Sequence, residues 1–264
     1  MKKNQLSNII LQSNNIHLWL SFPNEIFENS LLSAYWEILS KDEQKKQQRF
    51  YFEKDRHLYL VSHALVRTTL SLYTGIDPKR LGFFQNRYGR PELFIGETSL
   101  PLRFNLSHTD GLIACAVVLK EDIGVDVERI KRSENYMEIA NSYFSDNEKY
   151  ELNMINDDDK KKRFIDYWTL KESYTKAKGM GLYMPLEKFS FHILDFERIS
   201  VNFDPELADN PEQWQFYLLK PIPDYRVSLS VSKTINTSMK VKTKKVVPLN
   251  KGEIFDCDIL NQSY

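Results

Sequence analysis

The sequence predicts an α+β fold in which strands joined by hairpins are segregated from helices. Three observations favour this class. Short strand-like runs occur in pairs separated by polar turns, and longer segments with apolar residues at helical spacing lie between the pairs. The order strand, helices, strands occurs twice along the chain. Neither a GxGxxG nor a Walker-type loop is present, which argues against a doubly wound parallel sheet or a P-loop fold.

The first half of the chain begins with a strand and continues with helices. Residues 16–22, IHLWLSF, alternate weakly and predict a strand. Residues 30–72 predict two helical segments, and Gly75 is the natural stop of the second one. Further strand-like segments follow at 81–93, 102–108 and 112–118, the first of them with the tight turn YGRP.

The second half repeats this content. A strand is predicted at 123–130, and residues 135–154 predict helices, with Ser145 as an N-cap inside them. The amphipathic segment 164–182 follows as a helix that ends at a glycine. Closing strands are predicted at 189–196, 214–221 and 225–232. We therefore divide the chain into an N-terminal half at 1–120, a C-terminal half at 121–237 and a tail at 238–264, which is left unassigned.

Composition excludes several classes of function. The chain has 264 residues, and its 36 basic and 36 acidic residues balance, so no global field attracts nucleic acid or an anionic membrane. No apolar run approaches the ~18 residues of a membrane span. The two cysteines lack metal-ligand spacing, and the N-terminus lacks the features of a signal peptide. We expect a cytoplasmic monomer that binds neither nucleic acid nor membrane.

The strand at 123–130 carries the first group of chemical interest. Side chains alternate in a strand, so Asp126 and Glu128 share one face with Gly124, while Ile123 and Val125 face the core. The two carboxylates could converge on one cation, and the glycine would leave room for a ligand. An ordinary solvated acidic face is the alternative.

The helix at 164–182 carries the second group. Trp168, Glu172 and Lys176 are four residues apart and therefore lie on one helical face. Glu172 could be a third carboxylate for magnesium, which fills its octahedron with water and phosphate oxygens, and Lys176 could meet that phosphate. The alternative is a solvated face with a Glu–Lys pair that contributes about 0.2–0.5 kcal/mol.

Ser107 and His108 form the third group. Adjacent residues of a strand point to opposite faces, so the histidine cannot simply deprotonate the serine as in a hydrolase. A hydroxyl and an imidazole both suit a phosphate, and this predicts an anion contact. A capping serine and a structural histidine are the alternative.

The segments FNLSHTDGLIACAV, IGVDVE and FIDYWTLKESYTKAKGMGL, in this order, resemble the 4'-phosphopantetheinyl transferase superfamily, and more closely its Sfp-type members. The family pattern is a Ser-His segment, a Gly-(Ile/Val)-Asp strand with a second acidic residue two positions on, and a Trp-x-x-Lys-Glu-(Ser/Ala)-x-x-Lys helix. The segments RFYFEKDRHLYLVSHALVR and YGRP extend the resemblance, which covers residues from about 40 to about 232.

The resemblance implies two similar, pseudo-twofold-related α+β halves, each a small, mainly antiparallel sheet with packed helices, and coenzyme A between them. It implies magnesium, or manganese, held by Asp126, Glu128 and Glu172. Lys176, Ser107 and His108 would contact phosphates, and Arg90, Lys46 and His57 would bind the nucleotide end. Where close relatives carry a second basic residue, this chain has Glu43, and Lys45, Arg49 or Lys54 would substitute for it.

The implied reaction moves 4'-phosphopantetheine from coenzyme A to a serine of an apo acyl, peptidyl or aryl carrier protein and releases 3',5'-ADP. Asp126, Glu172 and Lys176 are the expected catalytic residues. A magnesium-dependent phosphodiesterase and a non-catalytic carrier- or coenzyme-A-binding module are the alternatives. Docking of the carrier is expected on an apolar segment beside two basic residues: Tyr136, Met137, Ile139 and Phe144, with Lys131 and Arg132.

Overall fold

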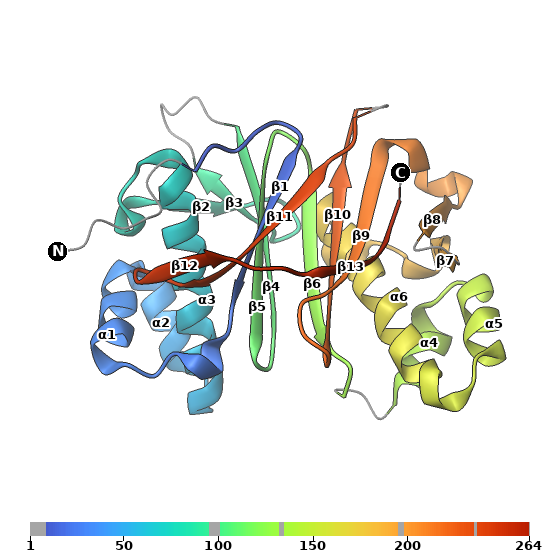
Figure 1. The fold of residues 1–264 in the computed structure, drawn as a ribbon, viewed down its shortest axis with the longest axis horizontal. Helices are drawn as coiled ribbons and strands as arrows, with labels where there is room; N and C mark the ends of the chain where they lie inside the picture. The colour runs from blue at the N-terminus through green and yellow to red at the C-terminus, as the bar shows by residue number, and fades with distance from the viewer. Residues whose placement is uncertain (1–8, 95–100, 132–134, 195–197, 235–236, 264) are drawn as a thin grey trace.

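Two mixed sheets stand side by side at the centre of the molecule, with helices packed at both ends (Figure 1). The structure, a computed structural model, describes residues 9–94, 101–131, 135–194, 198–234 and 237–263. The helices are α1 (Asn29–Ile38), α2 (Lys41–Arg49), α3 (Glu53–Thr74), α4 (Tyr136–Tyr143), α5 (Asp146–Met154) and α6 (Asp157–Lys178). The α+β class predicted from the sequence is confirmed.

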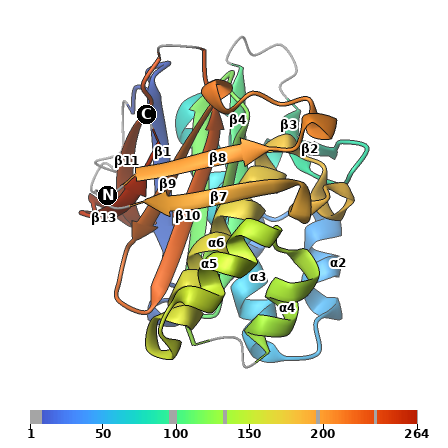
Figure 2. The ribbon, with the colours of Figure 1, turned by 90° about the vertical axis from the view of Figure 1, so that its right-hand side faces the viewer.

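The first sheet has the order β12-β11-β1-β5-β4, the second has the order β6-β10-β9-β13-β8-β7, and β2 and β3 form a separate hairpin. The strands of the first half are β1 (Asn15–Ser21), β2 (Gly82–Gln85), β3 (Pro91–Phe94), β4 (Leu102–Thr109) and β5 (Leu112–Leu119). Those of the second half are β6 (Ile123–Arg129), β7 (Phe189–Leu194), β8 (Arg198–Phe203), β9 (Trp214–Lys220) and β10 (Tyr225–Ser232). Figure 2 shows the hairpin β7–β8 above α4 and α5.

The two halves repeat one arrangement of elements. Strand β1 is followed by three helices and four strands, and β6 is followed by the same series. Helices α3 and α6 both have 22 residues, and their bounds differ by the same 104 positions (157 − 53 and 178 − 74). Both end at a glycine in the left-handed conformation, Gly75 and Gly179. The predicted pair of similar halves is therefore confirmed.

The halves meet where β4 and β6, the facing edge strands of the two sheets, run next to each other. Side chains of β4 satisfy the backbone of β6. The Asn105 Oδ1 atom accepts a hydrogen bond of 2.9 Å from the Val125 amide, and Ser107 Oγ accepts one of 3.4 Å from the Val127 amide. Because edge amides need partners, these two side chains hold the halves together without a continuous backbone ladder.

Helix α6 lies directly on strand β6, and Gly124 is the reason that it can. A Cβ atom added at Gly124 would stand 1.9 Å from the Ser173 carbonyl oxygen and 2.4 Å from the Ala177 amide nitrogen. The expectation that this glycine makes room for a ligand is therefore wrong, because the backbone of α6 fills that space. The close approach brings the two predicted catalytic groups of the helix over the acidic strand.

Three apolar clusters form the core, one in each half and one between them. Ile123, Val125 and Val127 belong to the central cluster, as the alternation of the strand predicts. Phe144 belongs to the cluster of the second half, is fully buried, and stacks on Phe164 with ring centroids 5.2 Å apart. Its predicted role in docking a carrier is therefore wrong.

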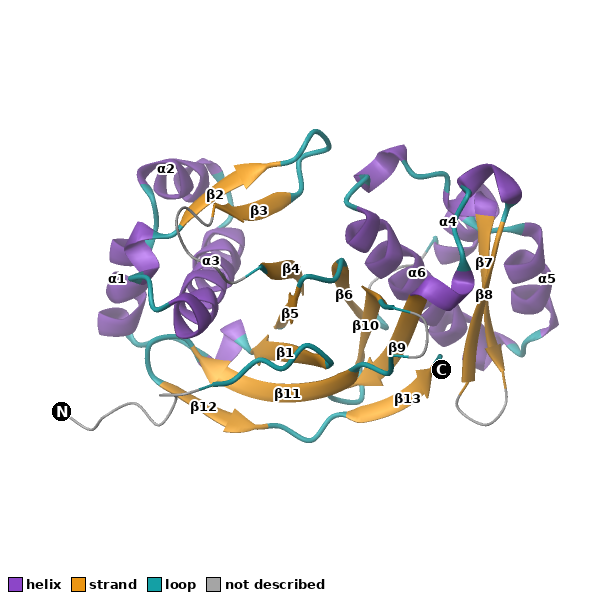
Figure 3. Ribbon diagram, turned by 90° about the horizontal axis from the view of Figure 1, so that it is seen from above, coloured by secondary structure: helices purple, strands orange, loops and turns teal. Residues whose placement is uncertain are grey.

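The tail, which the sequence left unassigned, adds strands to both sheets. It forms β11 (Lys240–Val247), β12 (Lys251–Ile254) and β13 (Asp258–Gln262). Strand β11 pairs in parallel with β1, and β13 pairs antiparallel with β9 of the other half. Figure 3 shows these strands crossing the molecule on the side away from the hairpin β2–β3. The proposed boundaries at residues 120 and 237 stay predictions.

The described part of the chain contains no helix that is long and apolar enough to cross a membrane.

Candidate active site

Asp126, Ser107 and Lys176 form a tight cluster at the junction of the halves. The Lys176 ammonium donates to Asp126 Oδ1 at 2.6 Å and to Ser107 Oγ at 2.9 Å, and Ser107 Oγ also donates to the same carboxylate oxygen at 3.0 Å. Asp126 is only 4% exposed, and its Oδ2 atom is buried without a hydrogen-bond partner. The structure thus unites three of the predicted site residues, each from a different element.

Glu172 is the second carboxylate of this cluster. Burial raises the pKa of its carboxyl group, and the nearby Asp126 raises it further, while Lys176 lowers it. The single ammonium of Lys176 therefore does not compensate for the burial of Glu172 and its repulsion from Asp126. Glu128 lies half-buried further along β6. Within the described residues, no three Asp, Glu, His or Cys side chains already converge as a metal site, so the three-carboxylate site stays a prediction.

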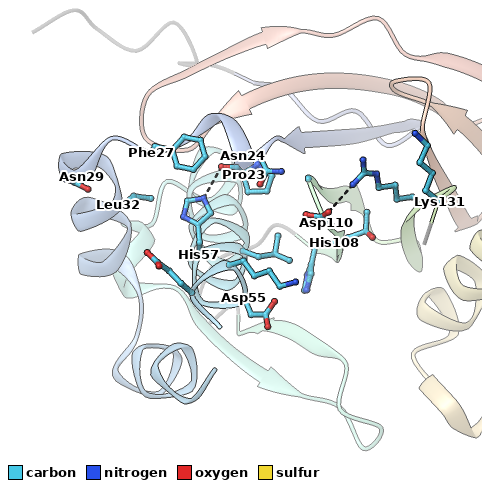
Figure 4. A pocket seen from close by; sticks show the side chains of 16 residues that line it. Pro23, Asn24, Phe27, Asn29, Leu32, Asp55, His57, His108, Asp110 and Lys131 are labelled. Atoms are coloured by element: carbon cyan, nitrogen blue, oxygen red, sulfur yellow. Dashed lines mark hydrogen bonds and ion pairs between the residues drawn. The ribbon is translucent and has the colours of Figure 1, made fainter. Parts of the chain in front are cut away.

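A cleft of about 850 Å³ opens between the start of α3 and the turn after β4 (Figure 4). His57 and His108 line it from opposite sides. His57 stacks on Phe27 and shares a hydrogen bond of 2.9 Å between Nε2 and the Pro23 carbonyl oxygen. The cleft reaches β4 at His108, the residue after Ser107, and it reaches the end of β6 at Arg129, but the residues of the carboxylate cluster do not themselves line it.

The cleft combines cationic side chains with the beginning of a long helix. Lys54, Arg129 and Lys131 line it together with the two histidines. The first residues of α3 also line it, and the N-terminus of a helix carries partial positive charge. Acidic side chains are present as well, and Asp110 forms an ion pair with Arg129 at 3.0 Å. Such a lining suits a ligand that carries several phosphates.

Lys46 and Arg90, the other predicted nucleotide contacts, do not line this cleft. Lys46 is exposed on α2, and its ammonium lies 5.9 Å from the centre of the Tyr59 ring. The guanidinium of Arg90 is buried and donates to the backbone carbonyls of Ala177 and Ile123. Of the predicted substitutes, Lys54 lines the cleft.

Glu43, where the sequence departs from close relatives, has a structural role. It closes a capping box with Ser40 at the start of α2. Its carboxylate also accepts hydrogen bonds from Arg67 and shares one with His63. Burial alone would raise the pKa of Glu43, yet these hydrogen bonds and the Ser40 amide lower it to about 2. A basic residue here would break this network.

Lys171 is the feature that sequence reasoning missed. It is one of the charged residues that would suit a solvated helical face, yet it is fully buried. Its ammonium donates to the carbonyls of Leu186 and Phe189 at 2.7 and 2.6 Å and pairs with Glu148 at 2.8 Å. The N-cap predicted at Ser145 begins a capping box with this Glu148, and the SDNE pattern was the sequence signal that placed a glutamate there.

The expected docking segment is only partly available. Tyr136, Met137 and Ile139 are half-buried, and Tyr136 and Ile139 pack against the core of the second half. Lys131 is exposed, whereas Arg132 lies outside the described residues. Only part of each apolar side chain therefore remains for a partner.

Comparison with known proteins assigns the chain. The model of the 4'-phosphopantetheinyl transferase superfamily matches residues 122–230, and the model of the N-terminal part of 4'-phosphopantetheinyl transferase matches residues 28–120. The 4'-phosphopantetheinyl transferase HetI of Nostoc sp. is 34% identical over 177 residues, which are 66% of this chain and 73% of that protein. The chain belongs to the 4'-phosphopantetheinyl transferase superfamily.

Among these transferases the Sfp-type members are similar to this chain. The 4'-phosphopantetheinyl transferase Sfp of Bacillus subtilis is 29% identical over 196 residues, which are 74% of this chain and 83% of Sfp. A structure of the holo-(acyl-carrier-protein) synthase of Bacillus anthracis in complex with coenzyme A covers 43% of this chain and 96% of that chain, at 15% identity and a TM-score of 0.36. Strands β11–β13 lie beyond both family matches. The predictions of the family and of a transferase are confirmed.

Proposed function

We propose that this transferase moves 4'-phosphopantetheine from coenzyme A to a serine of an apo carrier protein at the junction of its halves, with magnesium, and releases 3',5'-ADP. The observation that carries the proposal is the cluster of Asp126, Glu172, Lys176 and Ser107, on strands and a helix that adjoin a cleft lined by two histidines and by both basic and acidic side chains. The cleft would hold the nucleotide and its phosphates through His57, His108 and Lys54.

The residues of the cluster fit a divalent cation. Asp126 Oδ2 is buried and has no hydrogen-bond partner, which is costly unless a cation or donor meets it. The raised pKa of Glu172 points the same way, since added positive charge would relieve its repulsion from Asp126. Asp126, Glu172 and Glu128 would hold magnesium, or manganese. The metal would supply charge neutralisation at the pyrophosphate oxygens.

The transfer itself is a displacement at the β-phosphorus. The oxygen of the acceptor serine forms a new bond to phosphorus, the bond from phosphorus to the bridging oxygen breaks, and 3',5'-ADP leaves with the electron pair. Glu172 would take the serine proton, directly or through water, through a carboxylate oxygen that the metal does not hold. Lys176 has a third N–H for the leaving oxygen beyond the two that it uses here.

The carrier would approach the second half beside α4. Carrier proteins present an acidic helix with apolar residues, and Lys131 next to the half-exposed Tyr136 and Met137 complements such a surface. The two free cysteines fit a reducing, cytoplasmic environment.

One assay tests the function. The protein is incubated with coenzyme A, magnesium and an apo carrier protein, and the carrier is examined by mass spectrometry. We expect a mass increase of ~340 Da on the acceptor serine. Cleavage of coenzyme A at the same rate without a carrier would indicate a phosphodiesterase instead, and binding without any covalent product would indicate a non-catalytic module.

A further inference from the structure

We infer that Arg90 is a positioning residue that holds the end of α6 against β6, and that it does not contact the 3'-phosphate of coenzyme A. By fixing α6, it sets the position of Lys176 relative to Asp126. This inference rests on the proposed function, because it concerns the same site and the same substrate.

The contacts of the guanidinium connect the two catalytic elements. Nη1 donates to the Ala177 carbonyl at 2.7 Å, and Nη2 donates to the Ile123 carbonyl at 3.2 Å. Ala177 directly follows Lys176 in the helix, and Ile123 lies three residues before Asp126 in the strand. One planar side chain thus bridges the backbone of both elements close to the groups that would carry the reaction.

Hydrogen bonds to the side chain of Asn86 fix the turn that carries Arg90. Asn86 Oδ1 accepts hydrogen bonds from the amides of Tyr88 and Arg90, both at 2.9 Å. The Asn86 Nδ2 atom donates to the Gly179 carbonyl at 3.1 Å. Two side chains of one turn therefore bind the Ala177 carbonyl in the last turn of α6 and the Gly179 carbonyl just beyond it, at the helix end that carries partial negative charge.

An arginine is suited to this position and a lysine is not. The guanidinium is a rigid fork that donates in two directions in one plane, whereas an ammonium on a flexible stem is a point charge. Gly179 belongs to the same arrangement, because a Cβ there would come within 3.0 Å of Arg90 Cδ and of Asn86 Nδ2. Its left-handed conformation also favours glycine.

The environment of Arg90 separates it from the nucleotide cleft. Its side chain is 7% exposed, and it is absent from the residues that line the cleft of His57 and His108. It lines a different hollow, of about 330 Å³, together with Phe84 and Phe104. The nearest carboxylate, Asp122, is 3.9 Å from Nη1 and is bound more closely by Arg103.

The experiment compares coenzyme A with dephospho-coenzyme A, which lacks the 3'-phosphate and keeps the reacting pyrophosphate. We expect Arg90→Ala to lower kcat by about tenfold or more with both substrates, because a small displacement of catalytic groups has large effects on rate. The ratio of the two kcat/KM values should equal that of the wild type. Calorimetric affinity for coenzyme A should also be unchanged.

Arg90→Lys sharpens the test, because it keeps the charge and loses the fork. A positioning role predicts that the lysine variant is nearly as slow as the alanine variant, whereas a phosphate contact would be largely preserved by lysine. The matched control is Arg87→Ala, in the same turn but exposed, which should leave the rate unchanged. If circular dichroism shows that Arg90→Ala is unfolded, Asn86→Ala replaces it, because this variant removes the hydrogen bond to the Gly179 carbonyl. It should reduce kcat with both substrates by the same factor.

Two outcomes would overturn the inference. One is a loss of affinity for coenzyme A that is absent for dephospho-coenzyme A, and the other is a lysine variant with wild-type rates. A wild-type protein that modifies no carrier would instead remove the proposed function, and calorimetry on the Arg90 variants would still decide whether this side chain binds the 3'-phosphate.

Discussion

Arg67 and Lys171 occupy the same position in the two repeated helices, 14 residues after the first residue of each (67 − 53 and 171 − 157). Each neutralises the glutamate of a capping box in the preceding helix, Glu43 or Glu148. Each also donates to two backbone carbonyls that lie just before or at the start of the next strand. One buried cation therefore ties three consecutive elements together in both halves.

Replacing Lys171 should be the more damaging of the two changes. Lys171→Met leaves the fully buried Glu148 without its counter-charge, although Ser145 and the Phe191 amide still donate to its carboxylate, and it removes the ammonium donor from two carbonyls. Removing one partner of a buried ion pair costs about 3–5 kcal/mol. Arg67→Met should cost less, since Glu43 keeps His63 as a partner and is partly exposed. Urea unfolding by circular dichroism measures both. A loss of unfolding free energy that is equal for the two variants, or larger for Arg67→Met, would contradict the prediction. Adding Glu148→Gln to Lys171→Met should restore part of the unfolding free energy.

Glu172→Gln should abolish transfer and stabilise the fold. Burial first, and Asp126 second, raise the pKa of Glu172 above 4.5, so the folded state binds this proton more tightly than the unfolded chain does. Stability therefore falls as pH rises from 4.5 through the raised pKa, and the ionised side chain remains destabilising at higher pH.

The measurement is the Tm of Glu172→Gln and wild type with a chelator, at about pH 7.5 and about pH 4. The variant should melt higher at the first pH and the same at the second. Glu253→Gln, on the exposed strand β12, is the control that should change neither Tm nor activity. A lower Tm at neutral pH would contradict the raised pKa.

Asp126→Asn should lower transfer by about 10²-fold or more while the fold persists, because it removes the charge at the site and keeps the shape. An alanine would be a poorer choice, since Asp126 is buried and accepts two hydrogen bonds. Turnover is measured over a range of magnesium concentrations. Asp258→Asn, at an exposed side chain of β13, serves as control. Near-wild-type turnover in a folded Asp126→Asn variant would remove this carboxylate from the mechanism.

Carrier docking beside α4 predicts a selective effect of Met137→Asp. A new negative charge there should raise the KM for an acidic carrier and leave the KM for coenzyme A unchanged. Ile254→Asp, on the exposed strand β12 at the other end of the molecule, is the matched control (Figure 1). Equal changes in both KM values for Met137→Asp would place docking elsewhere.

The tail should contribute to global stability through its buried side chains. Met239 is 3% exposed in the central core, its amide donates to Gln215, and its carbonyl accepts from Tyr217. Met239→Ala should therefore cost about 2–5 kcal/mol of unfolding free energy. Met154→Ala, at a residue that is 71% exposed, should cost almost nothing. Similar values for the two variants would show that the tail is only loosely attached.

Periodicity predicted most elements because each half buries one face of its helices and strands. Strand β6 illustrates this, since its alternation alone separated Val125 from Asp126 correctly. The tail could not be found in this way. Strand β11 alternates lysine with small or branched residues, and its pairing with β1 depends on a partner more than 200 positions away (240 − 15 = 225).

The cluster of the site was predictable by residue type and only partly by contact. Strand and helix spacing predicted that Asp126, Glu172 and Lys176 are the charged residues of the site. The 2.6 Å contact between Lys176 and Asp126 could not be predicted, because it depends on how closely α6 approaches Gly124. Arg90 shows the opposite limit. Its motif indicated a cation near phosphates, whereas burial and two backbone acceptors become visible only when α6 and β6 are placed. A motif thus indicates which residues belong to the site, whereas the contacts of each side chain depend on tertiary packing.

The parallel pairing of β1 with β11 has a consequence for how the chain is made. Strand β1 leaves the ribosome long before β11 and keeps one edge unpaired until residues 240–247 have been synthesised, since these supply its neighbour in the sheet. An unpaired edge recruits other chains, and contacts distant in sequence form slowly. During that interval the nascent N-terminal half depends on the short antiparallel pairing with β5, which is complete about 120 residues earlier.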